Sequence, residues 1–369
     1  MKWKRILGWS TLAIIVLLFG CFQSAYWRST NDCGRSIAPG AELMKAIRYC
    51  EYGSPDVLKI VEVEKPLPKD NELLVRVRAA SLNFIDANLV SGPLVGRLIF
   101  GLRKPKFTGF GQDFAGVVEA VGQNVAGFKP GDEVFGRKSG SVAEYICARK
   151  DRVALKPSTV TFEEAGAVAH AGLTALQGLR AGKIRPGQKV LINGASGGVG
   201  TFALQIAKAF ETEVTAVCST RNLEMARTLG ADHVIDYTKE DFTKGKERYD
   251  LIFDNVNNHS MSERRGILEP DGICVLAGVG SAGAKGQMGR IARSLAGSLW
   301  SDFTDKKFAH YITTPNEADL EFLRDLMAKG RVKPFVEKTY PMVETANALR
   351  YFGEGHVRGK IVIEVASNL

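Results

Sequence analysis

The stretch Val190-Leu191-Ile192-Asn193-Gly194-Ala195-Ser196-Gly197-Gly198-Val199-Gly200 decides the fold of this chain. An apolar strand runs into a glycine-rich turn, and a helix begins within that turn. The glycines permit a tight turn, close approach of the main chain to a pyrophosphate, and close packing of helix on strand. The N–H groups and the positive end of the new helix then attract phosphate. The stretch therefore predicts a dinucleotide site that comprises Gly194, Ala195, Ser196, Gly197, Gly198, Val199 and Gly200.

Strand-like and helix-like segments alternate after this turn. A helix is expected over 198–210 and another over 223–229, and short apolar strands are expected at 213–219, 233–236, 250–256 and 274–280. This alternation predicts a parallel sheet covered by helices on both faces. In that setting a dinucleotide site is favoured over the alternative, a glycine turn that binds no ligand. One more strand is expected at 307–313 and a helix at 316–329, while 281–306 stays unassigned.

The segment before the turn has a different pattern. Residues 45–80 contain short runs of period two, and similar runs follow at 114–122, 132–136 and 141–149. They predict a compact antiparallel β domain. A capping box of Thr161 and Glu164 opens a helical segment that runs to about Ala181. Strand-like runs at 335–341 and 360–365, with a helix over 343–352 between them, end the chain.

Composition and charge exclude some functions. The chain has 369 residues and a net charge of +9, but its Lys and Arg residues are scattered, so nucleic-acid binding is not expected. Six cysteines form no C-x-x-C pair and none lies near a histidine at metal-ligand spacing. Neither a disulfide framework nor a zinc site is expected, and the catalytic part reads as a protein of a reducing compartment.

Residues 6–27 carry no charge, and aromatic residues flank both ends of the segment. About 22 residues at roughly 1.5 Å each span roughly 30 Å, which is enough to cross a bilayer. We therefore expect residues 1–28 to form a single-pass membrane anchor; a cleaved signal or a lipoprotein signal at Cys21 are the alternatives. Residues 29–43 read as a tether. The early basic residues place the rest of the chain across the membrane from the cytoplasm, whereas the cofactor argues for the cytoplasm, so the side stays open.

The strand after the glycine turn indicates which dinucleotide is bound. About twenty residues past the first glycine, an NAD site would carry an acidic residue. This chain has Cys218-Ser219-Thr220-Arg221 there. The Ser219 hydroxyl and the Arg221 guanidinium are suited to a 2′-phosphate, which favours NADPH. The alternative for Arg221 is an exposed arginine at a helix start.

With these residues in view, the chain from about 44 onward resembles the zinc-independent quinone oxidoreductases and zeta-crystallin-like enzymes of the medium-chain dehydrogenase/reductase superfamily. Seven segments carry the likeness in order: 80–86 (ASLNFID), 111–118 (GQDFAGVV), 130–136 (PGDEVFG), 171–175 (AGLTA), the glycine turn, 229–237 (LGADHVIDY) and 358–362 (RGKIV). The resemblance implies an α/β architecture: a GroES-like β-rich catalytic domain over 44–165, a Rossmann domain over 166–314, and a return to the catalytic domain over 315–369.

The resemblance also implies the site residues. Asn83 and Thr174 would lie near the nicotinamide and the substrate carbonyl, with Asp86 beside them; Tyr237 would lie by the adenine; and Lys360, Asn255 and the strand end with Leu276, Gly278 and Val279 would line the cofactor. Three of these residues have a plainer alternative: Thr174 packed within its helix, Asp86 a helix cap, Lys360 a surface lysine. His170 is equally well a satisfied core histidine or a site residue.

Zinc-dependent relatives carry a cysteine where Asn83 stands, a His-Glu pair where Gln112-Asp113 stands, and a four-cysteine lobe that is missing here. The resemblance thus implies hydride transfer from NADPH without a metal, to a quinone or an α,β-unsaturated carbonyl. Asn83 would bind the acceptor carbonyl, and solvent or a tyrosine would supply the proton. Asn88 stands where relatives often carry an aromatic residue, so the substrate stays open. An enoyl-thioester reductase and a non-catalytic NADPH-binding or RNA-binding protein are the alternatives, and a homodimer through 307–313 is expected from the family.

Overall fold

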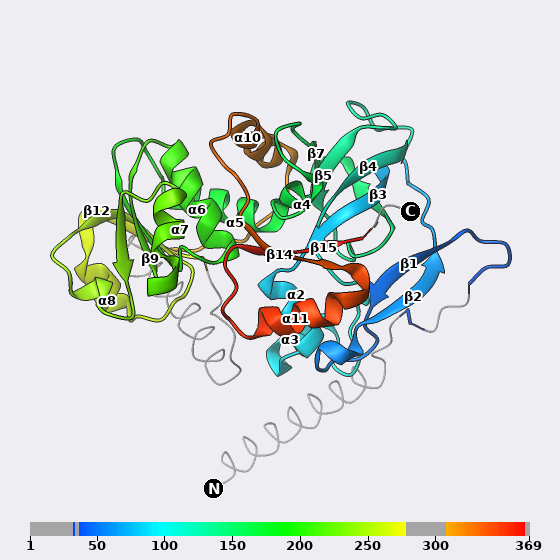
Figure 1. The fold of residues 1–369 in the computed structure, drawn as a ribbon, viewed down its shortest axis with the longest axis horizontal. Coiled ribbons are helices and arrows are strands. Elements are labelled where there is room, and N and C mark those ends of the chain that lie inside the picture. The colour runs from blue at the N-terminus through cyan, green and yellow to red at the C-terminus, as the bar shows by residue number, and fades with distance from the viewer. Residues whose placement is uncertain (1–31, 34–36, 278–307, 366–369) are drawn as a thin grey trace, which may run out of the picture.

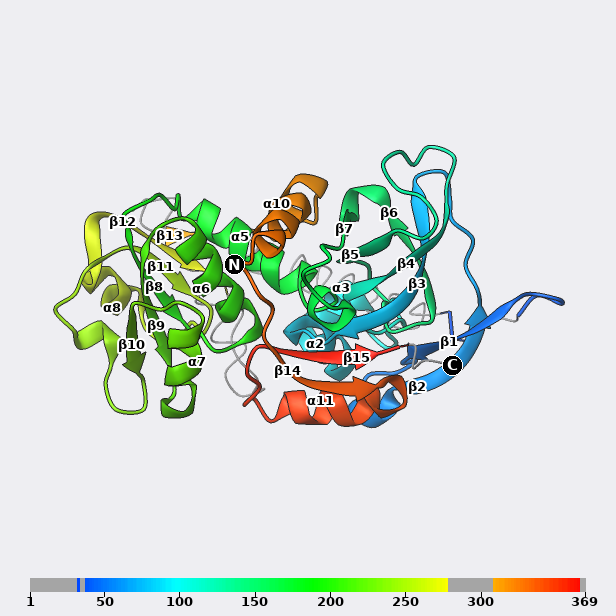
Figure 2. The same cartoon turned by 45° about the horizontal axis from the view of Figure 1, so that its top comes forward.

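The computed structural model describes residues 32–33, 37–277 and 308–365. These residues form two lobes, each built on its own sheet, and helix α5 (Ala169–Ala181) lies where the lobes meet (Figure 1). The second view shows the same two sheets, with the C-terminal strands beside β3 (Figure 2). The α/β architecture expected from the sequence is confirmed.

The catalytic lobe is a mostly antiparallel β structure. Its seven-stranded sheet has the order β14-β15-β3-β4-β5-β7, with β6 also paired to β3. The strands are β3 (Glu72–Ser81), β4 (Asp113–Val121), β5 (Glu133–Arg137), β6 (Tyr145–Arg149), β7 (Val153–Leu155), β14 (Val336–Pro341) and β15 (Lys360–Glu364). A separate pair, β1 (Leu43–Arg48) and β2 (Lys59–Glu64), lies beside it. Because β15 pairs with β3, the end of the chain completes the domain that the first segment starts.

Short helices complete this lobe. They are α2 (Phe84–Ser91), α3 (Leu94–Phe100), α4 (Phe162–Ala165) and α11 (Thr345–Gly353), with 3₁₀ turns at 55–57, 150–152 and 342–344. The capping box expected at Thr161 and Glu164 is present, because each side chain accepts a hydrogen bond from the other residue's N–H. The helical segment that starts there is divided into α4 and α5.

The second lobe is a six-stranded parallel sheet with the order β10-β9-β8-β11-β12-β13. Its strands are β8 (Lys189–Asn193), β9 (Glu213–Cys218), β10 (His233–Asp236), β11 (Tyr249–Asp254), β12 (Leu268–Leu276) and β13 (Phe308–Ala309). Its other helices are α6 (Gly198–Ala209), α7 (Leu223–Thr228) and α8 (Met261–Gly266), with 3₁₀ turns at 220–222 and 242–244. In chain order this is the 3-2-1-4-5-6 arrangement of a Rossmann fold, whose ligand crevice lies where the order reverses, between β8 and β11.

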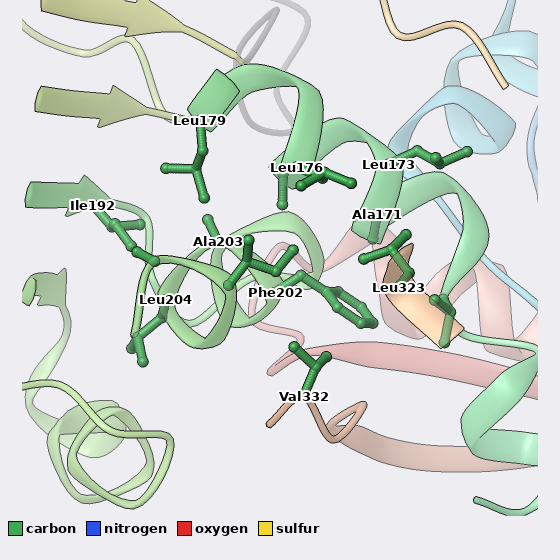
Figure 3. Close-up of a cluster of buried hydrophobic side chains, with 14 of the residues drawn as sticks. Ala171, Leu173, Leu176, Leu179, Ile192, Phe202, Ala203, Leu204, Leu323 and Val332 are labelled. Carbon is green, nitrogen blue, oxygen red and sulfur yellow. The ribbon is translucent and has the colours of Figure 1, made fainter. Parts of the chain in front are cut away.

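Both faces of this sheet are buried, which explains its continuous apolar strands. Val190 and Ile192 of β8 belong to one core with α5 and α6, whereas Leu191 between them belongs to a second core on the opposite face. In the first core, leucines of α5 pack against Phe202 and Ala203 of α6 (Figure 3). Leu323 of α10 (Glu317–Ala328) joins the same cluster, and this helix packs both on α5 and on β7 of the catalytic lobe.

The expected strand at 307–313 is much shorter in the structure. It is β13, two residues long, and it pairs with β12. Beyond it the chain turns toward α5, because the Tyr311 hydroxyl donates to the Thr174 carbonyl at 2.6 Å and Thr314 N–H donates to Gln177 at 2.9 Å. These contacts with a helix replace the pairing of an extended strand.

The expectation that no disulfide forms is wrong. Cys33 and Cys50 are joined, with their Cα atoms 5.8 Å apart and a sequence separation of 17. Next to the bridge, Asp32 accepts hydrogen bonds from Arg48 at 2.8 Å and from Thr108 at 2.5 Å. The described part of the tether is therefore fixed to the catalytic lobe. Pairing of these cysteines depends on the tether folding back on β1, which no local spacing reveals.

The proposed membrane anchor, residues 6–27, lies outside the described residues. Within the part of the chain that the structure describes, no helix has the length and apolar character needed to cross a bilayer.

Candidate active site where the two lobes meet

The glycine turn joins β8 to α6 as the sequence predicts. Gly194 adopts a φ of +82°, a left-handed conformation that favours glycine. A Cβ at Gly200 would lie 2.1 Å from the carbonyl oxygen of Gly194, so any side chain there would collide with the main chain of the turn. The helix then starts with Gly197 as its N-cap. A glycine turn at the N-terminus of a helix presents main-chain N–H groups, and this arrangement fits the pyrophosphate of a dinucleotide.

The other predicted cofactor residues follow the carboxyl ends of neighbouring parallel strands. Ser219 follows β9, Tyr237 follows β10, Asn255 follows β11, and Leu276 ends β12. The Asn255 N–H donates to the Asn193 carbonyl at 3.1 Å, which holds it beside the glycine turn. These residues share one edge of the sheet, the edge at which such folds bind their ligands. Gly278 and Val279 lie outside the described residues.

At the end of the predicted site where the 2′-phosphate of NADPH would bind, the polar side chains already have hydrogen-bond partners within the protein. The Arg221 guanidinium donates to the carbonyl oxygen of His356, and the Ser219 hydroxyl accepts from Asn222 at 3.0 Å. An acidic group is also present: Asp236 accepts a 2.6 Å hydrogen bond from Thr220. Hydrogen bonds from Thr220 and Thr238 hold the pKa of Asp236 down to about 2, so it is ionised at neutral pH. Tyr237 is 60% exposed.

The glycine turn contacts the catalytic lobe directly. The Gly359 N–H donates to the Ser196 carbonyl at 2.8 Å, and Gly197 and Gly359 form a parallel bridge. A Cβ at Gly198 would lie 3.0 Å from Cδ of Lys360, so the stem of that lysine packs on the start of α6. The segment 358–360 is thus the point where the cofactor turn and the catalytic sheet meet.

Lys360 is a buried site residue and not a surface lysine. Its side chain is 3% exposed, and its ammonium group donates to the Leu82 carbonyl at 2.9 Å, to Asn83 Oδ1 at 2.5 Å and to Asp113 Oδ2 at 3.3 Å. Burial lowers the pKa of Lys360, against the favourable charge of Asp113. An ammonium group has three hydrogens, and all three have acceptors here.

Asn83 and Asp86 stand at the start of α2. The Asn83 side chain donates from Nδ2 to Asp113 Oδ2 at 3.0 Å, and its main-chain N–H donates to Asp86 Oδ2 at 2.8 Å. Asp86 therefore caps this helix. Burial, with the nearby charge of Asp113, raises the pKa of Asp86 to about 7.

The sequence reasoning missed the residue at the centre of this cluster, Asp113. Its fully buried carboxylate accepts hydrogen bonds from Ser81 at 2.9 Å, from Asn83, from Lys360, and from the main-chain N–H of His170 at 2.6 Å. Burial opposes its ionisation, but the charge of Lys360 keeps the pKa of Asp113 below its usual value. An acidic residue that opens an apolar strand was the available signal, because a buried carboxylate requires partners.

Thr174 lies on the same helix, one turn after His170. Its hydroxyl donates to the His170 carbonyl at 2.7 Å and accepts from Thr313 at 3.2 Å. The plainer alternative, a threonine packed within its helix, therefore describes this hydroxyl. Burial lowers the pKa of His170 to about 4, so its imidazole is neutral near pH 7, and the Nδ1 atom has no hydrogen-bond partner.

No cluster of three potential metal ligands occurs among the described residues. Asn83 and Asp113 both contact the ammonium group of Lys360, which forms an ion pair with the carboxylate of Asp113.

Two family models match the chain. Residues 69–158 match the alcohol dehydrogenase GroES-like domain, and residues 229–363 match the family described as zinc-binding dehydrogenase. The chain is 32% identical over 335 residues to an NADPH-dependent alkenal/one oxidoreductase, chloroplastic, of Arabidopsis thaliana, a match that covers 87% of this chain and 79% of the relative.

Solved structures give the same result. The quinone oxidoreductase from Coxiella burnetii is 30% identical with a TM-score of 0.74, covering 88% of this chain and 100% of that one. The CurK enoyl reductase is 26% identical with a TM-score of 0.73, covering 87% and 99%. With the Rossmann strand order, the completed GroES-like sheet and the glycine turn, these matches show that the chain belongs to the quinone oxidoreductase-like family of the medium-chain dehydrogenase/reductase superfamily.

Proposed function

We propose that this protein transfers a hydride from NADPH to a quinone or an α,β-unsaturated carbonyl without a metal ion. The observation that carries this proposal is the buried cluster of Asn83, Asp113 and Lys360, which contacts the glycine turn. It sets a fixed hydrogen-bond donor beside the cradle for the dinucleotide. The similarity to an NADPH-dependent alkenal/one oxidoreductase supports the same reaction class.

NADPH, held by residues 194–200 with Ser219, Arg221, Tyr237, Asn255 and Leu276 along the strand ends, would supply the hydride. Asn83 would act on the acceptor. Its Oδ1 faces the Lys360 ammonium and one Nδ2 hydrogen faces Asp113, so the second Nδ2 hydrogen remains to donate to a carbonyl oxygen. A fixed donor of this kind stabilises the negative charge that develops on the oxygen as hydride arrives.

Asp86, Thr174 and Lys360 would act indirectly. Asp86 holds the main chain of Asn83, and Lys360 holds its amide oxygen. The Thr174 hydroxyl is directed at its own helix, so its contribution is to the shape of the site. We assign the proton that completes the reduction to solvent, because the polar groups of the cluster are already engaged with one another.

A second candidate is an enoyl-thioester reductase, favoured by the structural similarity to the CurK enoyl reductase. Asn88 stands at the position where relatives often carry an aromatic residue, so its side chain bears on which acceptor is bound. It is partly buried and donates to the Phe84 carbonyl of its own helix at 3.0 Å.

The test is an assay of the full chain, in detergent, with NADPH and three classes of acceptor: quinones, enals or enones, and enoyl thioesters. We expect oxidation of NADPH with quinones or enones, and a loss of kcat in Asn83→Ala of about 100-fold or more, the usual effect of removing one such donor. Turnover restricted to enoyl thioesters would favour the second candidate. Tight NADPH binding without turnover of any acceptor would leave a non-catalytic binding protein.

We also propose, from the sequence, that residues 6–27 anchor the protein in a membrane, which suits a lipophilic acceptor. The Cys33–Cys50 disulfide supports an oxidising compartment for the catalytic lobe, in agreement with the basic residues at the start of the chain. Protease protection on sealed membranes tests this placement: cleavage of the catalytic lobe from the cytoplasmic side would contradict it.

The domain division at residues 165 and 314 and a homodimer at the β13 end of the parallel sheet are further parts of this proposal. Light scattering on the purified chain measures the subunit number, and limited proteolysis locates the boundaries.

A further inference from the structure

Four donors from three separate parts of the chain meet at the carboxylate of Asp113. Ser81 ends β3, Asn83 precedes α2, Lys360 begins β15, and His170 contributes its main-chain N–H from α5. Asp113 itself begins β4. A fully buried carboxylate with partners from distant segments fixes their relative positions, because losing any one of them leaves the buried charge less well hydrogen-bonded.

The orientation of the Asn83 amide depends on this carboxylate. Lys360 Nζ lies 2.5 Å from Asn83 Oδ1, and Asp113 Oδ2 lies 3.0 Å from Asn83 Nδ2. The flipped amide would set its NH₂ group against an ammonium and its oxygen against a carboxylate, which is unfavourable at both ends. Asp113 and Lys360 together therefore decide the direction of the second Nδ2 hydrogen.

The same carboxylate reaches the parts of the chain that hold the cofactor turn. Its Oδ1 accepts from the His170 N–H at 2.6 Å, and α5, to which His170 belongs, packs against α6. Its other oxygen accepts from Lys360, whose stem packs on Gly198 at the start of α6. Asp113 is thus connected on one side to Asn83 and on the other to the helix that follows the glycine turn.

We propose that Asp113 is a positioning residue for hydride transfer. It holds the Asn83 amide and the cofactor-bearing helix in one geometry and does not itself touch the substrate. The inference rests on the proposed function, and it deepens that function by assigning a role to a residue of the same site. Displacement of reacting groups by about 1 Å costs on the order of 100-fold in rate, so a loosened cluster should slow the reaction strongly.

A purely structural role for Asp113 gives a different result, and a pair of variants separates the two. Asp113→Asn leaves the Lys360 ammonium buried without its counter-charge, so it lowers stability under either interpretation. The double variant Asp113→Asn with Lys360→Met removes both charges, so stability should recover in part. Because Lys360→Met also removes the hydrogen bond to Asn83 Oδ1, the double variant is compared with Lys360→Met alone. If Asp113 is only structural, kcat should be no lower in the double variant than in Lys360→Met. If it is a positioning residue, kcat should be lower in the double variant, since nothing then orients Asn83.

The experiment uses the full chain in detergent, with kcat and KM for the acceptor, the Kd for NADPH, and the urea midpoint measured for each variant. We expect kcat to fall about 100-fold in Asp113→Asn and to stay within about threefold of that in the double variant, with KM and the NADPH Kd changed by less than about threefold. The control is Asp151→Asn, the same substitution in an exposed ion pair with Arg149. Recovery of kcat in the double variant to the value of Lys360→Met would overturn the inference, as would a rise in KM with kcat unchanged.

A second readout separates this inference from the proposed function. If the wild-type protein binds NADPH but reduces no acceptor, the proposed function fails, and the fluorescence of the bound nicotinamide then tests the positioning role. We expect the emission maximum and lifetime of bound NADPH to change in Asp113→Asn and in the double variant, because the nicotinamide is held differently. Emission identical to that of the wild type in both variants would overturn the positioning role even without turnover.

Discussion

Arg264 and Asp254 form an ion pair with almost no access to water: Arg264 Nε lies 2.6 Å from Asp254 Oδ2, and the two side chains are 1% and 0% exposed. Arg264 also donates to Asn257, whose main chain adopts a φ of +58°. The carboxylate ends β11 directly before Asn255, and it accepts from Asn193 at 2.8 Å. The pair therefore lies under the crevice side of the Rossmann sheet.

Removing one partner of this pair should be costly, because the other charge stays buried. We expect Arg264→Met to lower the free energy of unfolding by about 3–5 kcal/mol, and the added change Asp254→Asn to restore part of it. Urea denaturation followed by circular dichroism measures both. The matched control is Arg265→Met, the same change at the next, exposed position of α8. If Arg265→Met lowered the free energy of unfolding as much as Arg264→Met, the importance assigned to the buried ion pair would be contradicted.

Some of this site could be predicted from the sequence because the signals are local. The glycine turn, the strand ends and the capping box of Thr161 depend on residues within a few positions of one another. The predicted parallel sheet has the strands expected between 189 and 276, although β13 is far shorter than predicted. Family resemblance, rather than periodicity, indicated that the end of the chain returns to the first domain.

Other features depend on contacts between distant residues, which no local pattern shows. The donors to Asp113 come from positions 81, 83, 170 and 360, and the disulfide needs the tether to fold back on β1. The hydrogen bond from Arg221 to the carbonyl of His356 joins two segments 135 residues apart. Burial, which turns Lys360 from a surface lysine into a site residue, is likewise a property of the folded chain.

Asp86 should make stability depend on pH in a defined direction. Burial raises its pKa to about 7 in the folded protein, whereas an unfolded chain has a value of about 3.9. Between these pH values the folded state binds more protons, so the contribution of Asp86 to the free energy of unfolding falls as pH rises from about 4 to about 7 and is constant above that.

Asp86→Asn removes this dependence while keeping an oxygen that accepts the Asn83 N–H. Relative to the wild type, the variant should gain about 2–3 kcal/mol in the free energy of unfolding between pH 5 and pH 8, from urea denaturation at each pH. His170 has the opposite dependence, since its lowered pKa removes stability as pH falls toward 4, but it is present in both proteins and cancels. A difference that does not vary with pH would show that Asp86 is ionised in the folded state throughout.

Gly200→Ala should remove cofactor binding. The new Cβ would lie 2.1 Å from the Gly194 oxygen and 2.7 Å from Cα of Ala195, so the turn must open. We expect the NADPH affinity, measured by fluorescence titration, to fall about 100-fold or more, with overpacking lowering stability by about 1–3 kcal/mol. Gly266→Ala is the control, because no atom lies within 4 Å of its Cβ position. Unchanged NADPH binding in Gly200→Ala would mean that the dinucleotide lies elsewhere.

The Arg221 guanidinium should distinguish NADPH from NADH. Removing one charge-assisted contact to a phosphate costs roughly tenfold in affinity, so Arg221→Ala should weaken NADPH by about that factor and leave NADH within about twofold. The ionised Asp236 ends the neighbouring strand β10 and is hydrogen-bonded to Thr220, so it repels a phosphate at this place; Asp236→Asn should therefore raise the ratio of NADPH to NADH affinity. Arg227→Ala, at an exposed position in α7, is the control. Equal losses for both dinucleotides would refute the assignment of Arg221 to the 2′-phosphate.

The Cys33–Cys50 bridge should stabilise the catalytic lobe and hold the tether to it. Closing a loop of this size in the unfolded chain contributes about 3 kcal/mol to the free energy of unfolding. The midpoint of thermal unfolding should therefore fall when dithiothreitol is added, and it should fall likewise in the variants Cys33→Ser and Cys50→Ser. Cys147→Ser is the control, because Cys147 carries a free thiol. Labelling with a maleimide of high mass before and after reduction counts the bridge directly. Disulfides persist in oxidising compartments. If every cysteine of the protein taken from its native membrane reacts with the maleimide before reduction, the bridge is absent. That result would also contradict the placement of the catalytic lobe across the membrane from the cytoplasm.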